Sequence, residues 1–85
     1  MRVELLGRPG CHLCDEAAAE LRRHVQQSGE ALAGLEVIEI NIEVDDQLHR
    51  EFLERIPVIR INGEIISEFV FDPEAFDAAL SRQTG

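Results

Sequence analysis

Lysine, tryptophan and tyrosine are absent from this chain of 85 residues, and cysteine occurs only twice. Without lysine, all eight basic residues are arginines, and they stand against 17 acidic residues, which gives a net charge of −9. Nucleic acids and anionic lipid head groups bind basic surfaces, so a surface this acidic repels both. We therefore expect no nucleic acid and no membrane among the partners, and neutral or basic protein surfaces fit better.

Long hydrophobic runs are missing as well. No stretch of 18 apolar residues is present to span a membrane, and residues 1–10 lack both the apolar core and the cleavage pattern of a signal peptide. We expect a soluble, cytoplasmic protein. In that reducing compartment, two cysteines spaced C-x-x-C suit catalysis or metal binding better than a structural disulfide.

The length and the apolar content bound the domain organisation. A chain of 85 residues has room for one domain, and its 45% of hydrophobic residues against 29% of charged residues can form a core. We expect residues 1–85 to fold as a single domain and to act as a monomer.

The apolar pattern alternates between strand and helix periods along the chain. It predicts strands over Arg2–Gly7 and Leu35–Ile42 and helices over 11–27 (starting at Cys11), Asp46–Arg55 and Glu74–Arg82. Two further strands, Val58–Ile61 and Ile65–Glu68, are predicted to form a hairpin around Asn62–Gly63. The order is β-α-β-α-β-β-α. Alternation at the start demands a parallel strand pair with a right-handed crossover, and the hairpin adds an antiparallel edge. The predicted fold is α/β, with a mixed four-stranded sheet and helices on both faces.

Several local expectations accompany this pattern. Asp45 and Asp72 precede helical segments as N-caps, and a proline after Asp72 suits a first helical turn. We expect the apolar run 69–71 to pack beneath the closing helix, and His24 and His49 to lie on helix surfaces.

The sequence Cys11-His12-Leu13-Cys14 lies where a strand and a Pro/Gly loop lead into a helix. Free backbone N–H groups and the dipole at a helix N-terminus stabilise an anion, so they favour the thiolate of Cys11. Cys14 lies one turn later on the inner face. This asymmetry predicts that Cys11 attacks a substrate disulfide and that Cys14 resolves the mixed disulfide.

Charges around the pair act in both directions. Arg8 and His12 are positive or can become so, whereas Asp15 and Glu16 place two negative charges in the same helical turn. Anions raise the pKa of a nearby thiol. We therefore expect the pKa of Cys11 towards the upper end of the range of about 3.5–7.5 that activated cysteines show.

Two other interpretations of the pair stay open. The protein could be a non-catalytic binding module, or the cysteines could hold a metal or an iron–sulfur cluster. A structural zinc site needs four ligands, and beyond the cysteines only scattered histidines are present, with no second paired spacing. We assign no residue as a metal ligand.

R-P-G-C-H-L-C after the first strand, I-P-V opening the third strand, and a hairpin followed by a closing helix resemble the glutaredoxin-like proteins of the thioredoxin-fold superfamily. The resemblance covers nearly the whole chain. It implies a thioredoxin-like fold, a thiol–disulfide oxidoreductase acting on protein or low-molecular-weight disulfides, and no bound cofactor. It also implies that Pro57 is cis beside the cysteine pair, with the backbone of Ile56 turned outward to pair with a substrate peptide.

The resemblance also bears on glutathione, which stays possible as a co-substrate. Glutaredoxins carry a basic residue at the position of Arg8, which meets a glutathione carboxylate, and a glycine pair where Ser67 and Glu68 stand here. A ligand that approaches the backbone closely needs glycine, and Glu68 would repel a carboxylate, so we expect glutathione to bind poorly. The candidate substrate-binding residues are Arg8, His12, Leu13, Ile56, Pro57 and Ser67.

Overall fold

The computed structural model describes residues 2–29 and 34–84. Its elements are β1 (Arg2–Gly7), α1 (His12–Gln27), β2 (Glu36–Asn41), the 3-10 turn η2 (Ile42–Val44), α2 (Asp46–Phe52), β3 (Val58–Ile61), β4 (Glu64–Glu68) and α3 (Pro73–Thr84). The predicted order of strands and helices is confirmed, and η2 is an addition. Within these described parts, no helix combines the length and the apolar character that crossing a membrane requires.

Helix α2 ends at Phe52, three residues before the predicted end at Arg55. The N–H groups of Arg55 and Ile56 both donate to the carbonyl of Phe52, at 2.8 and 3.0 Å, which tightens the last turn. The next residue, Pro57, has no N–H to offer and cannot extend the helix. The chain therefore turns directly into β3.

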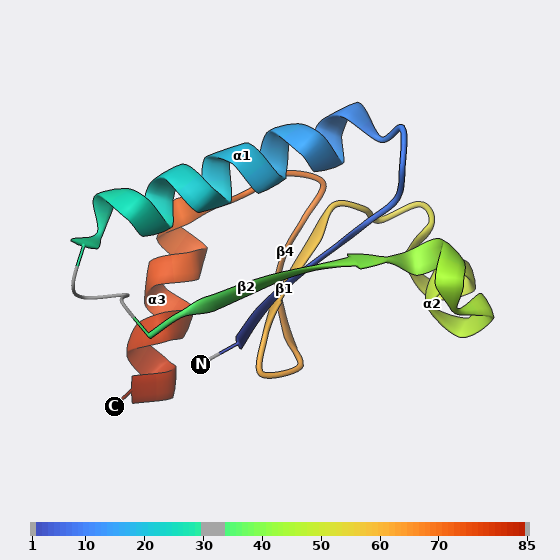
Figure 1. Cartoon of the computed structure of the whole chain (residues 1–85). Coiled ribbons are helices and arrows are strands. Elements are labelled where there is room, and N and C mark those ends of the chain that lie inside the picture. Colours follow the sequence, from blue (N-terminus) through green and yellow to red (C-terminus); the bar gives the residue numbers. More distant parts are fainter. Residues whose placement is uncertain (1, 30–33, 85) are drawn as a thin grey trace.

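The four strands form one mixed sheet in the order β2-β1-β3-β4 (Figure 1). Strand β1 pairs in parallel with β2, from Arg2 opposite Glu36 to Gly7 opposite Asn41. It pairs antiparallel with β3, and β3 forms an antiparallel hairpin with β4. The connection from β1 to β2 runs through α1, so the predicted crossover and hairpin are both confirmed.

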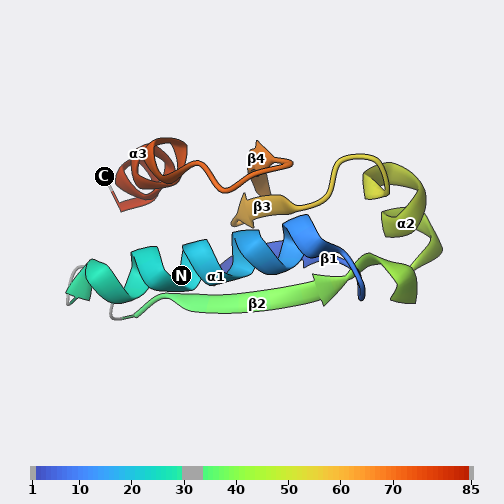
Figure 2. The same cartoon turned by 90° about the horizontal axis from the view of Figure 1, so that it is seen from above.

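Helices α1 and α3 cover one face of this sheet, and the main core lies between them and the strands (Figure 2). Leu5 and Ile59 of the central strands contribute to it together with Leu21 of α1 and Phe76 of α3. On the opposite face, α2 packs through Phe52 against the strands, near the end of the sheet at which β2 terminates (Figure 1). Helices on both faces, as predicted, thus enclose two hydrophobic clusters.

The β3–β4 hairpin determines where the residues after it point. Asn62 and Gly63 have φ values of 51° and 86°, a left-handed pair that suits the two-residue turn predicted here. The register then shifts: Ile59 lies opposite Ser67, whereas its neighbour in β3 lies opposite Ile65. Ile66 is therefore a bulge residue, and Ser67 faces the same side of the sheet as the buried Ile59.

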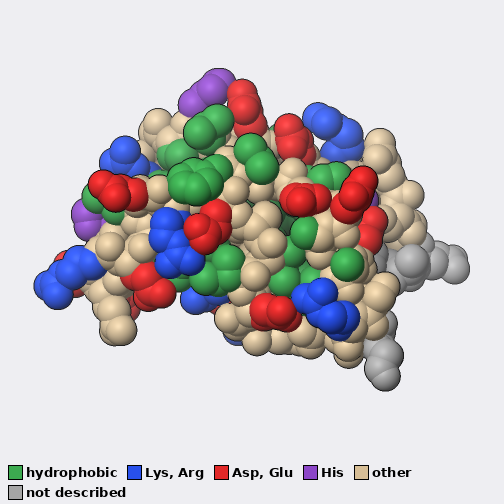
Figure 3. Space-filling view, turned by 180° about the vertical axis from the view of Figure 1, so that it is seen from behind, with side chains coloured by type: hydrophobic (Ala, Val, Ile, Leu, Met, Phe, Trp, Pro, Cys, Tyr) green, Lys and Arg blue, Asp and Glu red, His purple; other side chains and the backbone are tan. Residues whose placement is uncertain are grey.

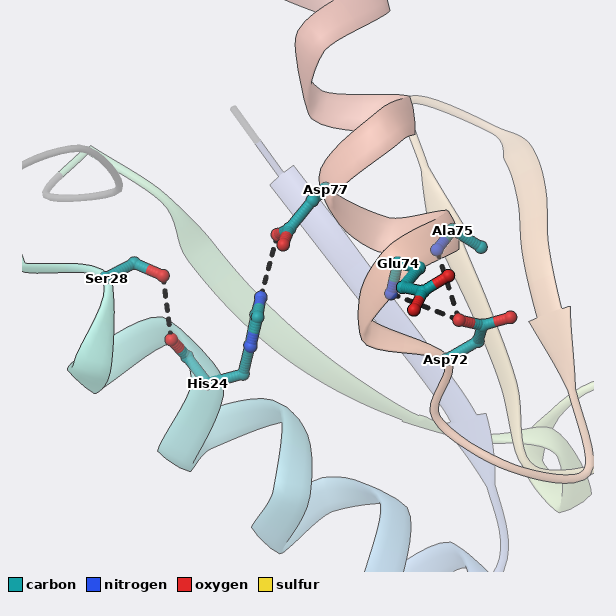
Figure 4. A network of polar contacts seen from close by, with 6 residues as sticks. All are labelled: His24, Ser28, Asp72, Glu74, Ala75 and Asp77. Atoms are coloured by element: carbon teal, nitrogen blue, oxygen red, sulfur yellow. Dashed lines mark hydrogen bonds and ion pairs between the residues drawn. The ribbon is translucent and has the colours of Figure 1, made fainter.

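Side chains of aspartate begin the last two helices, as predicted. Asp72 Oδ1 accepts hydrogen bonds from the backbone N–H groups of Glu74 and Ala75, at 3.1 and 3.2 Å (Figure 4). Asp45 does the same for the first turn of α2. Each cap satisfies N–H groups that have no partner within the helix.

His24 joins α1 to α3. Its Nε2 lies 2.7 Å from Oδ1 of Asp77 (Figure 4), and its ring meets Phe71 and Phe76 edge to face, at 5.5 and 5.7 Å. With 23% of its side chain exposed, His24 reaches the surface as expected, and it is also an interhelical contact, which was not expected. Helical spacing alone did not reveal that α3 packs over this position.

Candidate active site

A tight loop carries the chain from β1 to the first cysteine. The N–H of Cys11 donates to the carbonyl of Arg8 at 3.3 Å, which closes a turn, and Gly10 adopts φ +79° within it. Side chains with a Cβ rarely take that conformation, so glycine is required there. The turn places Cys11 at the N-cap of α1.

Cys11 and Cys14 are joined by a disulfide, with their Cα atoms 5.2 Å apart. The two ends differ in accessibility, because Cys11 is partly exposed whereas Cys14 is buried, with 5% of its surface exposed. The backbone N–H of Cys14 donates to Sγ of Cys11 at 3.1 Å. The more exposed cysteine is therefore also the one whose sulfur receives a hydrogen bond from the free end of the helix.

The charged side chains that closely follow Cys11 in sequence are exposed to solvent. His12 Nε2 lies 3.1 Å from a carboxylate oxygen of Glu16, one turn along α1, and both side chains are largely exposed. Asp15 is exposed as well. An ion pair this exposed contributes little to stability.

Cys14 is backed by the end of β1. A Cβ added to Gly7 would lie 3.0 Å from both Cβ and Sγ of Cys14, closer than such contacts normally are. A groove of about 240 Å³ opens beside the two residues, and its lining includes Arg8, Asp15 and Asn41. Gly7 is thus part of the site, although the sequence marks it only as the end of a strand.

The segment before β3 packs against the cysteines. Ile56 belongs to the same buried cluster as Cys14, and its peptide bond to the buried Pro57 is cis. The N–H of Ile56 donates to Phe52, as described above, and the carbonyl of Pro57 accepts from the N–H of Phe69 at 2.8 Å. Two backbone groups of this segment are therefore hydrogen-bonded within the chain.

Ser67 and Glu68 are successive residues of β4 and therefore face opposite sides of the sheet, and the bulge before them sets which side each one faces. The hydroxyl of Ser67 is buried and has no hydrogen-bond partner among the described residues. Glu68 accepts three hydrogen bonds of 2.8–3.2 Å from Arg55. This pairing, chiefly through the hydrogen bonds, lowers the pKa of Glu68 and raises the pKa of Arg55. Glu68 is thus a carboxylate that is already paired with Arg55.

On the other side of the pair, Leu13 faces the loop between β4 and α3. Leu13, Phe69 and Val70 are 52%, 50% and 61% exposed and line one shallow pocket. The expectation that residues 69–71 pack beneath α3 is right for Phe71, which is 7% exposed, and wrong for the other two. The positive φ of Phe69, +71°, and its N–H bond to Pro57 turn the chain so that only Phe71 reaches the core.

The structure therefore separates the predicted site residues into groups. Ile56 belongs to the cluster that contains the cysteines, and Pro57 is the buried residue after it. Arg8 and Leu13 lie in two different surface depressions, and Ser67 is turned into the sheet face beneath the helices. In residues 2–29 and 34–84, no three side chains of His, Cys, Asp or Glu gather as a metal site requires.

A family model described as "Glutaredoxin-like domain (DUF836)" matches residues 2–81. The chain belongs to this glutaredoxin-like family. A search of the curated proteins finds no significant match.

Solved structures share the fold of this glutaredoxin-like chain. The target protein XcR50 from X. campestris is 28% identical, with a TM-score of 0.68 over 94% of this chain and 96% of that one. Thioredoxin 1 from Thermosipho africanus is 12% identical, with a TM-score of 0.61 over the whole of both chains. The thioredoxin-like protein BC3987 is 18% identical, with a TM-score of 0.58 over 92% of this chain and 97% of that one. These similarities show a thioredoxin-like fold. The fold together with the Cys11–Cys14 pair suggests a redox role.

Proposed function

We propose that this protein is a small thiol–disulfide oxidoreductase in which Cys11 is the nucleophile and Cys14 the resolving cysteine. The observation that carries the proposal is the asymmetry of the pair: Cys11 is partly exposed at the N-cap of α1, and Cys14 is buried one turn later. An exposed sulfur can reach a substrate, whereas a buried one can react only within the protein.

The exchange transfers two electrons to the substrate. The Cys11 thiolate attacks one sulfur of a substrate disulfide, forms a mixed disulfide and releases the other sulfur as a thiolate, which takes up a proton. The Cys14 thiolate then attacks Sγ of Cys11, forms the Cys11–Cys14 disulfide and releases the second substrate thiol. A dithiol or thiol reductant returns the oxidised protein to the dithiol form by the same steps in reverse.

The first turn of α1 activates Cys11 in the reduced protein. The N–H of Cys14, which donates to Sγ of Cys11 at 3.1 Å in the disulfide form, would also donate to the thiolate. Hydrogen bonds to the charged form and the positive end of the helix dipole both favour the thiolate.

Protein disulfides are the proposed substrates, and glutathione is proposed to be a poor co-substrate. Ser67 and Glu68 carry side chains where glutaredoxins place a glycine pair, and the net charge of −9 opposes an anionic tripeptide. The proposal includes a monomer in the cytoplasm, where a reducing poise keeps such a pair available as a dithiol.

The test is the dithiothreitol-driven reduction of insulin, followed by the precipitation of its separated chains. The wild-type protein should accelerate precipitation at catalytic concentration, and Cys11→Ser should return the rate to that of dithiothreitol alone. Val44→Ser, a change at a surface residue of η2, serves as the control and should keep the wild-type rate. Equal acceleration by Cys11→Ser and wild type would refute the proposed function.

A further inference from the structure

A shallow groove, here named the α1–loop groove, begins beside the cysteine pair. It is lined by residues of α1 and of the loop between β4 and α3, namely Leu13, Glu16, Ala17, Glu20, Phe69, Val70 and Phe71. Because Leu13 lies between the two cysteines in sequence and lines this groove, a substrate chain bound to Cys11 can extend over it. The groove therefore lies where substrate residues beside the reacting cysteine would be.

One wall of the groove is apolar and exposed. The described part of the chain has six large hydrophobic side chains that are exposed, and three of them, Leu13, Phe69 and Val70, meet here. The wall is held in place, because the N–H of Phe69 donates to the carbonyls of Pro57 and Arg55, at 2.8 and 3.3 Å. When an apolar side chain covers such a cluster, apolar surface is removed from water, and this lowers the free energy of binding.

The other wall is acidic. Glu16 and Glu20 lie one turn apart on α1 and both line the groove, whereas none of its lining residues is basic. On the face drawn in Figure 3, hydrophobic side chains lie among acidic and basic ones. This acidic wall attracts a cationic side chain of a bound peptide and repels an anionic one.

The spacing fits an extended peptide. From Leu13 to Glu20 the helix advances about 10 Å, at roughly 1.5 Å per residue. Three residues of extended chain cover about the same distance, at roughly 3.3 Å each. If a bound peptide places an apolar side chain over Leu13, a basic residue about two or three positions further along the same peptide lies near Glu20.

We infer that the substrates are protein disulfides whose reacting cysteine is followed by an apolar residue and then, within about three positions, by arginine or lysine. This inference rests on the proposed function and adds the recognition of the substrate sequence. The apolar residue covers Leu13, Phe69 and Val70, and the cation faces Glu16 and Glu20.

The test compares three disulfide-linked homodimeric peptides that contain the segments Cys-Leu-Ser-Arg, Cys-Ser-Ser-Arg or Cys-Leu-Ser-Glu. The reduced protein is mixed with each, and acid-quenched samples give the single-turnover rate constants. The first peptide should react about three- to tenfold faster than the second, because its leucine is covered. It should also react about two- to fivefold faster than the third, the range expected for exposed ion pairs, and high salt should reduce that difference.

Matched pairs of variants test whether the preferences for arginine and for leucine both arise in the α1–loop groove. Glu20→Gln should reduce the preference for arginine over glutamate, whereas Glu36→Gln, which removes the same charge at the opposite end of the sheet, should keep it. Val70→Ser should reduce the preference for leucine, and Val44→Ser, at a residue 79% exposed outside the groove, should not. Equal effects of a groove variant and its control would overturn the inference.

The outcomes separate the inference from the proposed function. Equal rates for all three peptides would overturn the inference and leave the oxidoreductase function intact. Glutathione disulfide reacting faster than every peptide would also overturn the inference. A reduced protein that reacts with none of the peptides, and does not reduce the small neutral probe 2-hydroxyethyl disulfide, would refute the function and the inference together.

Discussion

Asp15, in the first turn of α1, and Glu16, directly after it, follow the reacting pair, and they differ in their contacts. Glu16 pairs with His12, whereas Asp15 lines the groove that borders Cys14. Negative charge this close to the helix N-terminus opposes the stabilisation of a Cys11 thiolate. Asp15, without a histidine partner in the described structure, is the stronger candidate for this effect.

Replacing Asp15 and Glu16 by asparagine and glutamine should therefore lower the pKa of Cys11 relative to wild type, because two anions near the thiolate are removed. Below that pKa the thiolate fraction should rise about two- to fivefold, as expected for exposed charges. Ultraviolet absorbance of the thiolate, titrated in a Cys14→Ser background, measures it. Glu43→Gln, at an exposed residue of η2, is the control. An unchanged titration would show that water screens these carboxylates fully.

Gly7 offers a second prediction for a single residue. Alanine normally stabilises a position that it can adopt without strain, but here its Cβ would lie 3.0 Å from Sγ of Cys14. Gly7→Ala should lower the free energy of unfolding by about 1–3 kcal/mol, the usual cost of overpacking. Gly34→Ala, where a Cβ would have no neighbour within 4 Å, should be close to neutral. Urea denaturation of the oxidised proteins compares them, and two equal values would mean that Cys14 yields without cost.

Between elements, the Arg55–Glu68 pair joins the turn after α2 to the end of β4. Arg55 also lies over the ring of Phe52, 4.9 Å from its centroid, so the pair is positioned by α2 as well. Because the pairing lowers the pKa of Glu68 below its usual value of 4.5, it stabilises the fold wherever Glu68 is ionised. That contribution is complete above about pH 4.5 and is lost as the pH falls through the lowered pKa.

Glu68→Gln should consequently destabilise the protein at neutral pH, and its difference from wild type should shrink towards zero as the pH falls well below 4.5. Urea unfolding at several pH values measures the difference. Glu43→Gln controls for the loss of one negative charge. A difference that stays constant across the acid range would show that the variant acts through packing and not through the ion pair.

How far the sequence predicts these elements depends on the range of the interactions that determine them. The strands, the helices and the caps at Asp45 and Asp72 follow from local periodicity and capping, so they were predicted to within a few residues. The contact between Gly7 and Cys14 joins a strand end to a helix, and the Arg55–Glu68 pair depends on the bulge in β4. Neither has a signal in the local pattern.

The candidate site was predictable to the same extent. The cysteine pair at a helix start is a local feature, and the structure places both residues as predicted, Cys11 partly exposed and Cys14 buried. The exposure of Phe69 and Val70 was not predictable, because an apolar run before a helix usually packs beneath it. Only the contact of their loop with Pro57 turns these two side chains outward.

At the scale of the whole molecule, charge and fold act together on the choice of co-substrate. The fold brings Arg8 to the surface near the pair, where a glutathione carboxylate could be met, but the net charge of −9 opposes an anionic ligand. The N–H of Ile56 already donates within the chain, so it offers a bound peptide no hydrogen bond in this conformation. The contributions that favour glutathione binding and those that oppose it thus arise from different parts of the structure.

The opposing contributions should prevail. We expect glutathione-coupled reduction of a small mixed disulfide to be slow and to show little saturation, while dithiothreitol-driven reduction of a protein disulfide is catalysed. A single exposed arginine contact contributes only about 0–1 kcal/mol, which is too little to offset a side chain in place of glycine and the like charge. Steady-state rates at increasing glutathione measure this, and saturation at low millimolar glutathione with rapid turnover would contradict it.

The division of roles between the two cysteines is the central claim, and trapping the mixed disulfide tests it most directly. Reduced Cys14→Ser protein is mixed with a peptide disulfide, quenched with acid and analysed by intact mass and peptide mapping. The account predicts a persistent peptide adduct on Cys11, none in Cys11→Ser, and only a short-lived adduct in wild type, since Cys14 resolves it. A persistent adduct on Cys14 in the Cys11→Ser protein, with none on Cys11 in the Cys14→Ser protein, would contradict it.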